Sequence, residues 1–373
     1  MEPHVSTDTA TACPTCGAAV TPGARFCEGC GAPLAGTDPS APVPRHEPDE
    51  AGPISRPTNR QRVTAPEPAV RPCAACGGEV GPDLYCTTCG TKAPSPRDHY
   101  RESPAPWVAG VCDRGVRHTR NEDAMALFAD PTPDGGRAVL VVCDGVSSSA
   151  DSDTASLAAA RAALEVLVPP LPRGLGTADS EDAAAAAVLS RAAAAANAAV
   201  IANSDPSSDN PASCTWVAAV LEGGTVRYAG LGDSRAYLLP DDGPGVQLTV
   251  DDSLAQELVD AGTPRTDAER SPTAHTIVRW LGLDAPDVRP RVGSARVEGP
   301  GWLLVCSDGL WNYASEPQAL RAQVDAAGVT DPEGLALALV EWACAQGGRD
   351  NVTVALARVG SQWADSEVRE DHG

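Results

Sequence analysis

Residues 140–145 read Leu-Val-Val-Cys-Asp-Gly, an apolar run that stops at a carboxylate followed by glycine. The same pattern returns at residues 303–309 as Leu-Leu-Val-Cys-Ser-Asp-Gly. Residues 350–356 mirror it, because Asp-Asn leads there into Val-Thr-Val-Ala-Leu. Short apolar runs bounded by polar turns predict buried strands. We therefore expect three strands, each with an aspartate at one end.

These three aspartates, Asp144, Asp308 and Asp350, predict a metal site. A single Asp-Gly pair usually marks only a turn, and a solvated acidic surface is the competing interpretation for a chain with 50 acidic and 28 basic residues. Surface acids fall without regard to strand ends, whereas each of these abuts a run that should be buried. Oxygen ligands fixed by separate strands suit Mg²⁺ or Mn²⁺, and the carbonyl of Gly145 can approach such an ion as a further ligand.

Two further acidic stretches complete an ordered series. Residues 113–123 end in Arg-Asn-Glu-Asp, and residues 232–235 read Gly-Asp-Ser-Arg. In this order and spacing, residues 107–360 resemble the metal-dependent Ser/Thr protein phosphatases of type 2C, the PPM family. The resemblance implies an α+β fold, a four-layer αββα sandwich in which two antiparallel sheets are flanked by helices.

The resemblance also implies the roles of the acids. The metal ligands would be Asp144, Gly145 through its carbonyl, Asp308, Asp350 and, for a third and weaker ion, Asp233. Asp144 would bridge the two main ions, and Glu122 and Asp123 match acids that stand behind the ligands. Two Mn²⁺ or Mg²⁺ ions lower the pKa of a water and neutralise charge on phosphoryl oxygens. The expected activity is hydrolysis of phosphoserine and phosphothreonine in proteins.

The sequence departs from the family at the phosphate-binding arginine, where His118 stands instead. We expect the neighbouring Arg117 to contact the phosphate through a one-residue strand irregularity, because a guanidinium binds phosphate bidentately. Residues 146–151 replace a glycine-rich stretch, Asn312 stands where some relatives carry a carboxylate, and residues 248–253 have no assigned role. His118 and the changed stretch 146–151 keep open a second interpretation, a pseudophosphatase or adaptor that binds phosphoproteins without turnover.

The N-terminal part contains four Cys-x-x-Cys-Gly knuckles. Their cysteines are Cys13, Cys16, Cys27 and Cys30 in one pair of knuckles, and Cys73, Cys76, Cys86 and Cys89 in the other. Paired knuckles place four thiolates around Zn²⁺, so we predict two structural zinc ribbons, each stabilised by about 10 kcal/mol of metal binding. Disulfides are the competing interpretation. No secretory signal or membrane span is recognised, so a reducing cytoplasm is expected.

Composition predicts the remaining organisation. The expected segments are ribbon 1 at 11–34, a disordered Pro-rich linker at 35–72, ribbon 2 at 73–92, a second linker at 93–106, the phosphatase domain at 107–360 and an acidic tail at 361–373. Expected helices cover residues 154–167, 181–202, 253–261, 318–327 and 334–345. Residues 215–221 and 225–231 predict a hairpin around Gly-Gly.

Charge limits the partners. The net charge is −22 and the only lysine is Lys92, so a third interpretation, a zinc-ribbon protein that binds nucleic acid, is disfavoured by repulsion from phosphate backbones. We expect a monomer that acts on phosphoprotein substrates of Ser/Thr kinases. A protein partner is the expected role for the ribbons.

Overall fold

The computed structural model describes residues 72–73, 75–81, 85–91 and 93–360, together with the backbone of residues 11–12 and 19–20. The chain divides into two units, Met1–Ala69 and Val70–Gly373. In the first unit, β1 (Thr11–Ala12) and β2 (Ala19–Val20) pair antiparallel. Outside the described residues lie the predicted ligands Cys13, Cys16, Cys27 and Cys30, almost all of the predicted linker 35–72, and the tail 361–373.

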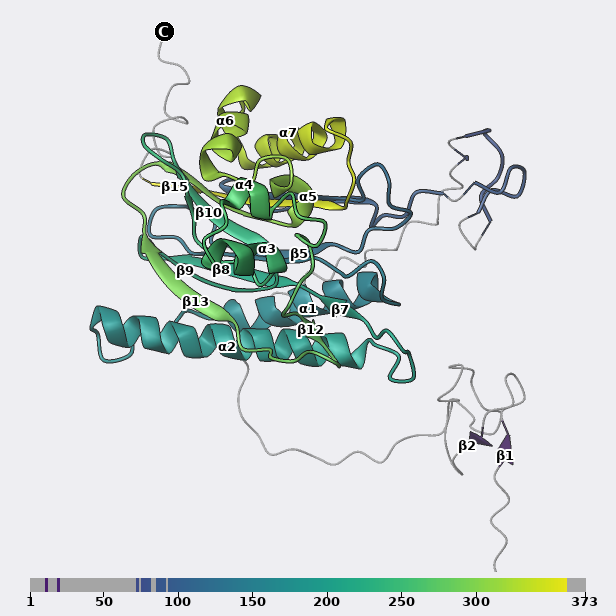
Figure 1. Ribbon diagram of the computed structural model, residues 1–373, viewed down its shortest axis with the longest axis horizontal. Helices are drawn as coiled ribbons and strands as arrows, with labels where there is room; N and C mark the ends of the chain where they lie inside the picture. Colours follow the sequence, from purple (N-terminus) through teal and green to yellow (C-terminus); the bar gives the residue numbers. More distant parts are fainter. Residues whose placement is uncertain are drawn as a thin grey trace, which may run out of the picture. The chain divides into compact units, whose positions relative to one another are not determined.

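Two antiparallel sheets form the centre of the second unit (Figure 1). The six-stranded sheet has the order β11-β10-β14-β15-β4-β3, and the five-stranded sheet has the order β13-β9-β8-β6-β5. The strands of the first are β3 (His99–Ala105), β4 (Val108–Asp113), β10 (Arg235–Pro240), β11 (Val246–Gln247), β14 (Gly301–Cys306) and β15 (Val352–Val359). Those of the second are β5 (Ala124–Ala129), β6 (Ala138–Cys143), β8 (Trp216–Glu222), β9 (Thr225–Leu231) and β13 (Arg291–Arg296). A short separate pair joins β7 (Ser213–Cys214) to β12 (Leu281–Gly282).

The sheets pack face to face through an apolar layer that includes Trp107, Met125, Leu140 and Leu303. Helices cover both outer faces. α1 (Ser152–Leu167) and α2 (Ala178–Ala202) pack on the five-stranded sheet, while α6 (Pro317–Ala327) and α7 (Pro332–Ala345) pack on the six-stranded sheet (Figure 1). The predicted four-layer αββα sandwich is therefore confirmed. Central strands such as β6 read as unbroken apolar runs because both of their faces are buried.

Three further helices are short: α3 (Leu254–Asp260), α4 (Arg265–Ala268) and α5 (Asp308–Trp311), the last of which packs against the six-stranded sheet. Among the helices of the described part, only α2 is long and apolar enough to cross a membrane by length and composition. Its residues Ala185, Leu189 and Val200 are buried in the core against α1 and the sheet. Small alanines let the two helices approach closely, and the helix fits this layer as a core element.

The linker predicted for residues 93–106 is wrong over its second half. His99–Ala105 form β3, an edge strand that pairs with β4. Residues 99–105 resemble a linker in sequence because the outer face of β3 is exposed and polar. Pro104 is tolerated in this strand because the pairing with β4 shifts register between Glu102 and Ala105. Its inward side chains join the two sheets: Met125 N donates to Tyr100 Oη at 2.9 Å and Leu127 N donates to Glu102 Oε2 at 2.9 Å.

Candidate metal centre

The predicted metal-binding aspartates come from both sheets. Asp144 follows β6 of the five-stranded sheet, whereas Asp308 follows β14 and Asp350 precedes β15 in the six-stranded sheet. Because β14 and β15 are antiparallel neighbours, the end of one and the start of the other lie at the same edge. The sandwich therefore brings three carboxylates, far apart in sequence, to one end of the two sheets.

These carboxylates are close enough to raise one another's pKa. Burial raises the pKa of Asp144 well above its ordinary value, and repulsion from Asp123 and Asp308 raises it further. The pKa of Asp308 is raised by burial and then by repulsion from Asp350. Burial is also the main cause that raises the pKa of Asp123 to about 7 and that of Asp233 to about 7. Bound cations would relieve this repulsion.

The donor set fits divalent cations. In the part of the chain that the structure describes, three buried carboxylate oxygens have no hydrogen-bond partner: Glu122 Oε2, Asp123 Oδ1 and Asp308 Oδ1. A buried charged oxygen without a partner is strongly unfavourable, and an all-oxygen group suits Mg²⁺ or Mn²⁺. In the described part of the chain no three of these carboxylates bring their oxygens within 4.8 Å of one another. The carboxylate oxygens are therefore spread more widely than in a compact three-ligand cluster.

Both Asp-Gly steps require glycine. A Cβ on Gly145 would lie 2.7 Å from the carbonyl oxygen of Glu122, and one on Gly309 would lie 1.9 Å from that of Asn351. Gly145 N donates to Glu122 O at 3.2 Å. Backbone contacts therefore fix the predicted carbonyl ligand, Gly145, against the segment that carries Glu122.

Asp123 is held by two hydroxyl groups that sequence reasoning missed. Ser307 Oγ donates to Asp123 Oδ2 at 2.6 Å, and Thr353 Oγ1 donates to the same oxygen at 2.7 Å. Ser307 precedes Asp308, and Thr353 lies on β15 shortly after Asp350. The strands that present the ligands thus also orient the carboxylate behind them. The only available signal was a hydroxyl residue inside each apolar run.

Asn351 fixes the loop that precedes β5. Its Oδ1 accepts from Glu122 N at 2.7 Å, and its Nδ2 donates to Arg114 O at 2.8 Å and to Arg120 O at 3.1 Å. Asn351 is 2% exposed, so its amide supplies hydrogen bonds that water cannot reach. Because Asn351 directly follows Asp350, these hydrogen bonds tie the loop to the start of β15.

The residues around the predicted phosphate contact differ in how they are held. Arg120 Nε donates to Glu122 Oε1 at 2.6 Å, and Arg114 Nη1 donates to His118 O at 2.6 Å. The ring of His118 lies between two acids, with Nε2 at 3.3 Å from Asp350 Oδ1 and Nδ1 at 3.6 Å from Glu122 Oε2. Arg117 is exposed, and its side chain has no partner among the described residues.

Asp233 is carried by a rigid turn between β9 and β10. Trp311 Nε1 donates to Asp233 O at 2.9 Å, and the guanidinium of Arg235 lies 3.6 Å from the centre of the Trp311 ring. Arg235 also pairs with Asp251 at 2.7 Å, and both side chains are almost fully buried. The segment 248–253, which had no assigned role, therefore provides the counter-ion of this turn.

Asn312 and the stretch 146–151, two other departures from the family pattern, form hydrogen bonds with residues of the candidate metal centre or its loop. Asn312 Nδ2 donates to Asp308 Oδ2 at 2.9 Å, so the amide orients a predicted ligand. In the stretch 146–151, Ser149 O accepts from Arg120 Nη2 at 3.0 Å, and Asp151 adopts a left-handed conformation with φ of 57° before α1. This loop is therefore anchored to Arg120 and ends at the start of a helix.

A cavity of about 470 Å³ lies beside the carboxylates. Asp308 and Asp350 line one side, and the rest of its lining includes His275, Trp311 and Arg349. The side chain of Arg349 has no partner in the described part of the chain, which makes it a second free cation near the acids.

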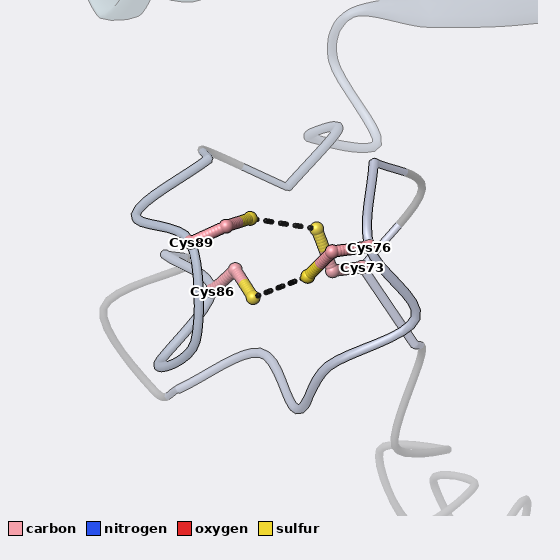
Figure 2. Close-up of side chains that lie close together, drawn as sticks. All are labelled: Cys73, Cys76, Cys86 and Cys89. Atoms are coloured by element: carbon pink, nitrogen blue, oxygen red, sulfur yellow. Dashed lines mark hydrogen bonds between the residues drawn. The ribbon is translucent and has the colours of Figure 1, made fainter.

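The second set of knuckle cysteines forms a compact cluster, drawn in Figure 2. The Sγ atoms of Cys73 and Cys89 lie 3.6 Å apart, those of Cys76 and Cys86 lie 3.5 Å apart, and all four lie within 4.8 Å of one another. Four thiolates around a tetrahedral Zn²⁺ stand about 3.8 Å apart. Gly78 N and Thr88 N donate to Cys76 Sγ and Cys86 Sγ, each at 3.4 Å. The cluster fits zinc, and its cysteines are free of disulfides.

The fold and this centre define a class of protein: a two-sheet αββα sandwich with a cluster of carboxylates at one end of the two sheets. Residues 114–342 match the family described as protein phosphatase 2C, and residues 13–96 match the double zinc ribbon. The chain belongs to the protein phosphatase 2C family and carries an N-terminal double zinc ribbon.

Similar proteins include bacterial phosphatases. The chain is 31% identical over 256 residues to the serine/threonine protein phosphatase PstP of Mycobacterium tuberculosis. This alignment covers 67% of this chain and 44% of PstP. It is 30% identical over 247 residues to the serine/threonine phosphatase stp of Listeria innocua, which covers 65% of this chain and 92% of stp. The crystal structure of the PstP catalytic domain with two manganese ions matches with a TM-score of 0.51 at 29% identity, over 68% of this chain and 97% of that one. The chain spans less than half of the length of PstP.

Proposed function

We propose that this chain is a protein serine/threonine phosphatase that depends on Mn²⁺ or Mg²⁺. The observation that carries the proposal is the group of carboxylates from both sheets, in which Asp123 Oδ1 and Asp308 Oδ1 are buried without a hydrogen-bond partner among the described residues. Similar proteins named serine/threonine phosphatases, one of them solved with two manganese ions, support it.

We assign the ligands as follows. Asp144 would hold both ions and Gly145 would contribute its carbonyl to one of them. Asp308 and Asp350 would complete the other, and Asp233 would help to hold a third. When bound, the ions supply Lewis acidity that activates water and neutralises the phosphoryl group. The protein's own part is to fix the carboxylates: Ser307 and Thr353 hold Asp123, and Asn351 holds the Glu122 backbone.

Arg117 is the proposed phosphate contact. Arg114 and Arg120 are engaged by backbone and carboxylate groups, whereas the Arg117 guanidinium is free to take a ligand. Two parallel N–H donors match two phosphate oxygens, which gives this contact both charge and direction. Glu122 and Asp123 complete the proposed catalytic group from behind the ligands.

A second candidate function is a pseudophosphatase that binds phosphoproteins without turnover. It is favoured by one observation: the His118 ring lies between Glu122 and Asp350, at the position where relatives carry the phosphate-binding arginine. A ring held between two acids cannot offer the bidentate contact of a guanidinium.

We further propose a modular organisation: two zinc ribbons in the first part of the chain, each with one Zn²⁺, and a phosphatase module that includes β3 and ends near residue 360. The substrates would be phosphoproteins produced by Ser/Thr kinases, and the ribbons would bind a protein partner. Four clustered thiols without disulfides suit a reducing compartment, the cytoplasm. The expected state is a monomer.

The decisive experiment uses the full chain and a phosphothreonine peptide, with and without Mn²⁺. The phosphatase proposal expects phosphate release that requires Mn²⁺ and disappears in Asp308→Asn. Binding of the peptide without phosphate release at any Mn²⁺ concentration would favour the pseudophosphatase instead.

A further inference from the structure

The residues directly before β3 form a tight turn. Ser95 N donates to Asp98 Oδ2 at 3.0 Å, Arg97 N donates to Ser95 Oγ at 3.2 Å, and Asp98 N donates to Ser95 O at 2.9 Å. Such side-chain contacts preform the turn. The turn lies within the stretch that sequence analysis assigned to a linker.

This turn is attached to the loop that carries Glu122. Arg97 Nη2 donates to Asp123 O at 2.7 Å and to Asn121 O at 3.3 Å. In return Asn121 Nδ2 donates to Arg97 O at 2.9 Å, and Arg114 N donates to Asp98 O at 2.7 Å. Residues 97–98 therefore hold the loop at both of its ends.

The buried guanidinium of Arg97 lowers the stability of the folded protein through its unpartnered donors. Arg97 Nε and Nη1 are buried and have no hydrogen-bond partner within the described ranges of the chain. A buried donor without a partner destabilises a protein by about 1–3 kcal/mol. An apolar side chain at this position would not leave buried donors unpaired. The favourable contribution of Arg97 therefore comes from its hydrogen bonds to the carbonyl groups of Asn121 and Asp123.

Those contacts bear on the metal centre through the backbone. The carbonyl groups of Asn121 and Asp123 are bound by Arg97, and the carbonyl of Glu122 between them accepts from Gly145 N at 3.2 Å and Ser156 Oγ at 2.5 Å. Loss of the outer two contacts would leave the segment held only by its remaining hydrogen bonds, and repulsion among its acids could then shift it. The position of Gly145 would move with it.

We propose that Arg97 is a positioning residue for the metal centre. It contacts neither substrate nor metal; it fixes the backbone of residues 121–123 and thereby the carboxylates of Glu122 and Asp123 and the carbonyl of Gly145. This inference rests on the proposed phosphatase function. Residues that orient metal ligands from behind typically change metal affinity or activity about 10–100-fold when they are removed.

The test compares Arg97→Ala with Arg101→Ala in the full, zinc-loaded chain. Arg101 lies on β3, is half-exposed and pairs with Glu333 of α7 at 3.2 Å, so it controls for the loss of an arginine from this segment. We expect Arg97→Ala to lower kcat about tenfold or more, to raise the Mn²⁺ concentration for half-maximal activity by a similar factor, and to leave KM within about twofold. Added guanidinium ion at millimolar concentration should restore part of kcat. Arg101→Ala should change none of these.

Calorimetric titration of Mn²⁺ separates this inference from the proposed function. If the wild-type chain turned over no peptide, the function would fail, yet weaker Mn²⁺ binding by Arg97→Ala than by Arg101→Ala would still support positioning. Equal Mn²⁺ affinity and equal kcat in the two variants would overturn it. Should Arg97→Ala not fold, Arg97→Lys carries the test, because an ammonium group lacks the planar set of donors; wild-type kcat and Mn²⁺ affinity in that variant would also overturn the proposal.

Discussion

The carboxylates of the metal centre destabilise the protein when no cation is bound. A carboxyl group whose pKa is raised by folding keeps a proton that the unfolded chain releases. Stability is therefore lost as the pH rises from about 4, the unfolded-state pKa, toward the folded-state value of about 7 for Asp123. Below that range both states are protonated and the penalty vanishes. Cations should remove the penalty at neutral pH.

Asp308→Asn should therefore abolish turnover and yet stabilise the metal-free protein. At pH 8 we expect a higher melting temperature than that of the metal-free wild type, with the difference shrinking toward pH 4, because a neutral amide cannot repel Asp350. Tryptophan fluorescence is a suitable probe, since all seven tryptophans lie at residue 107 or beyond. Asp134→Asn, an exposed control, should melt like the wild type. Identical melting of Asp308→Asn and the wild type at pH 8 would contradict the prediction.

Arg117→Ala should raise KM for a phosphothreonine peptide, with a smaller effect on kcat. A hydrogen bond to a charged group contributes about 1.5–3 kcal/mol, which corresponds to about 10–100-fold in affinity. Arg114→Ala is the matched control, because its guanidinium already donates to His118 O. If both variants shifted KM equally, or if only Arg349→Ala shifted it, the phosphate contact would lie elsewhere.

Some residues of the candidate site could be predicted from the sequence and others could not. The strand-end aspartates stood out because each interrupts an apolar run. The groups that orient them did not, since Ser307 and Thr353 resemble ordinary strand residues. Arg97 was hidden for a different reason: its partners are backbone carbonyl groups, which have no sequence signature. The sequence singled out Arg117 by its place beside His118, but only the structure shows that Arg114 and Arg120 are engaged while the Arg117 side chain has no partner among the described residues.

Among the elements, the five longer helices and the central hairpin were predictable, whereas β3 and the four-residue helices α4 and α5 were not. The predicted helix 154–167 corresponds to α1, Ser152–Leu167, and the hairpin corresponds to β8 and β9. Periodicity is strong in these elements because one face or both faces are buried. β3 has a polar outer face and contains Pro104, so it resembles a linker. Its pairing with β4 shows that it is a strand, and the contacts of Tyr100 and Glu102 with β5 show that it belongs to the sandwich.

The position of β3 changes where the chain can be shortened. A chain that begins at Ala93 should fold and retain Mn²⁺-dependent turnover on a small phosphopeptide. One that begins at Trp107 lacks β3, leaves the edge of β4 unpaired and removes the side chains that bond Met125 N and Leu127 N. We expect the shorter chain to melt at a lower temperature or to aggregate. Equal melting temperatures and equal kcat for the two would show that β3 is dispensable.

At the scale of the whole molecule, two kinds of metal should be separable. The thiolate cluster should retain Zn²⁺ while the carboxylate centre exchanges Mn²⁺. The purified chain should contain about two zinc ions per molecule if each set of four knuckle cysteines binds one. Cys76→Ser should lower the zinc content by about one ion and leave turnover of a small peptide unchanged, as measured by elemental analysis and phosphate release. Cys344→Ser, outside the knuckles, should keep both ions. Loss of turnover in Cys76→Ser alone would mean that the ribbon takes part in catalysis.

The place of β15 in its sheet has a consequence for biosynthesis. β15 is the last strand of the sandwich to be made, yet it lies between β14 and β4 and so divides strands that were synthesised earlier. Until the ribosome has produced it, the larger sheet is two separate fragments with bare edges, and Asp350 does not exist. On the proposed function, a nascent chain that has not yet reached Asp350 would lack one of the assigned metal ligands. Its unpaired edges are also where a chaperone would be expected to bind during synthesis.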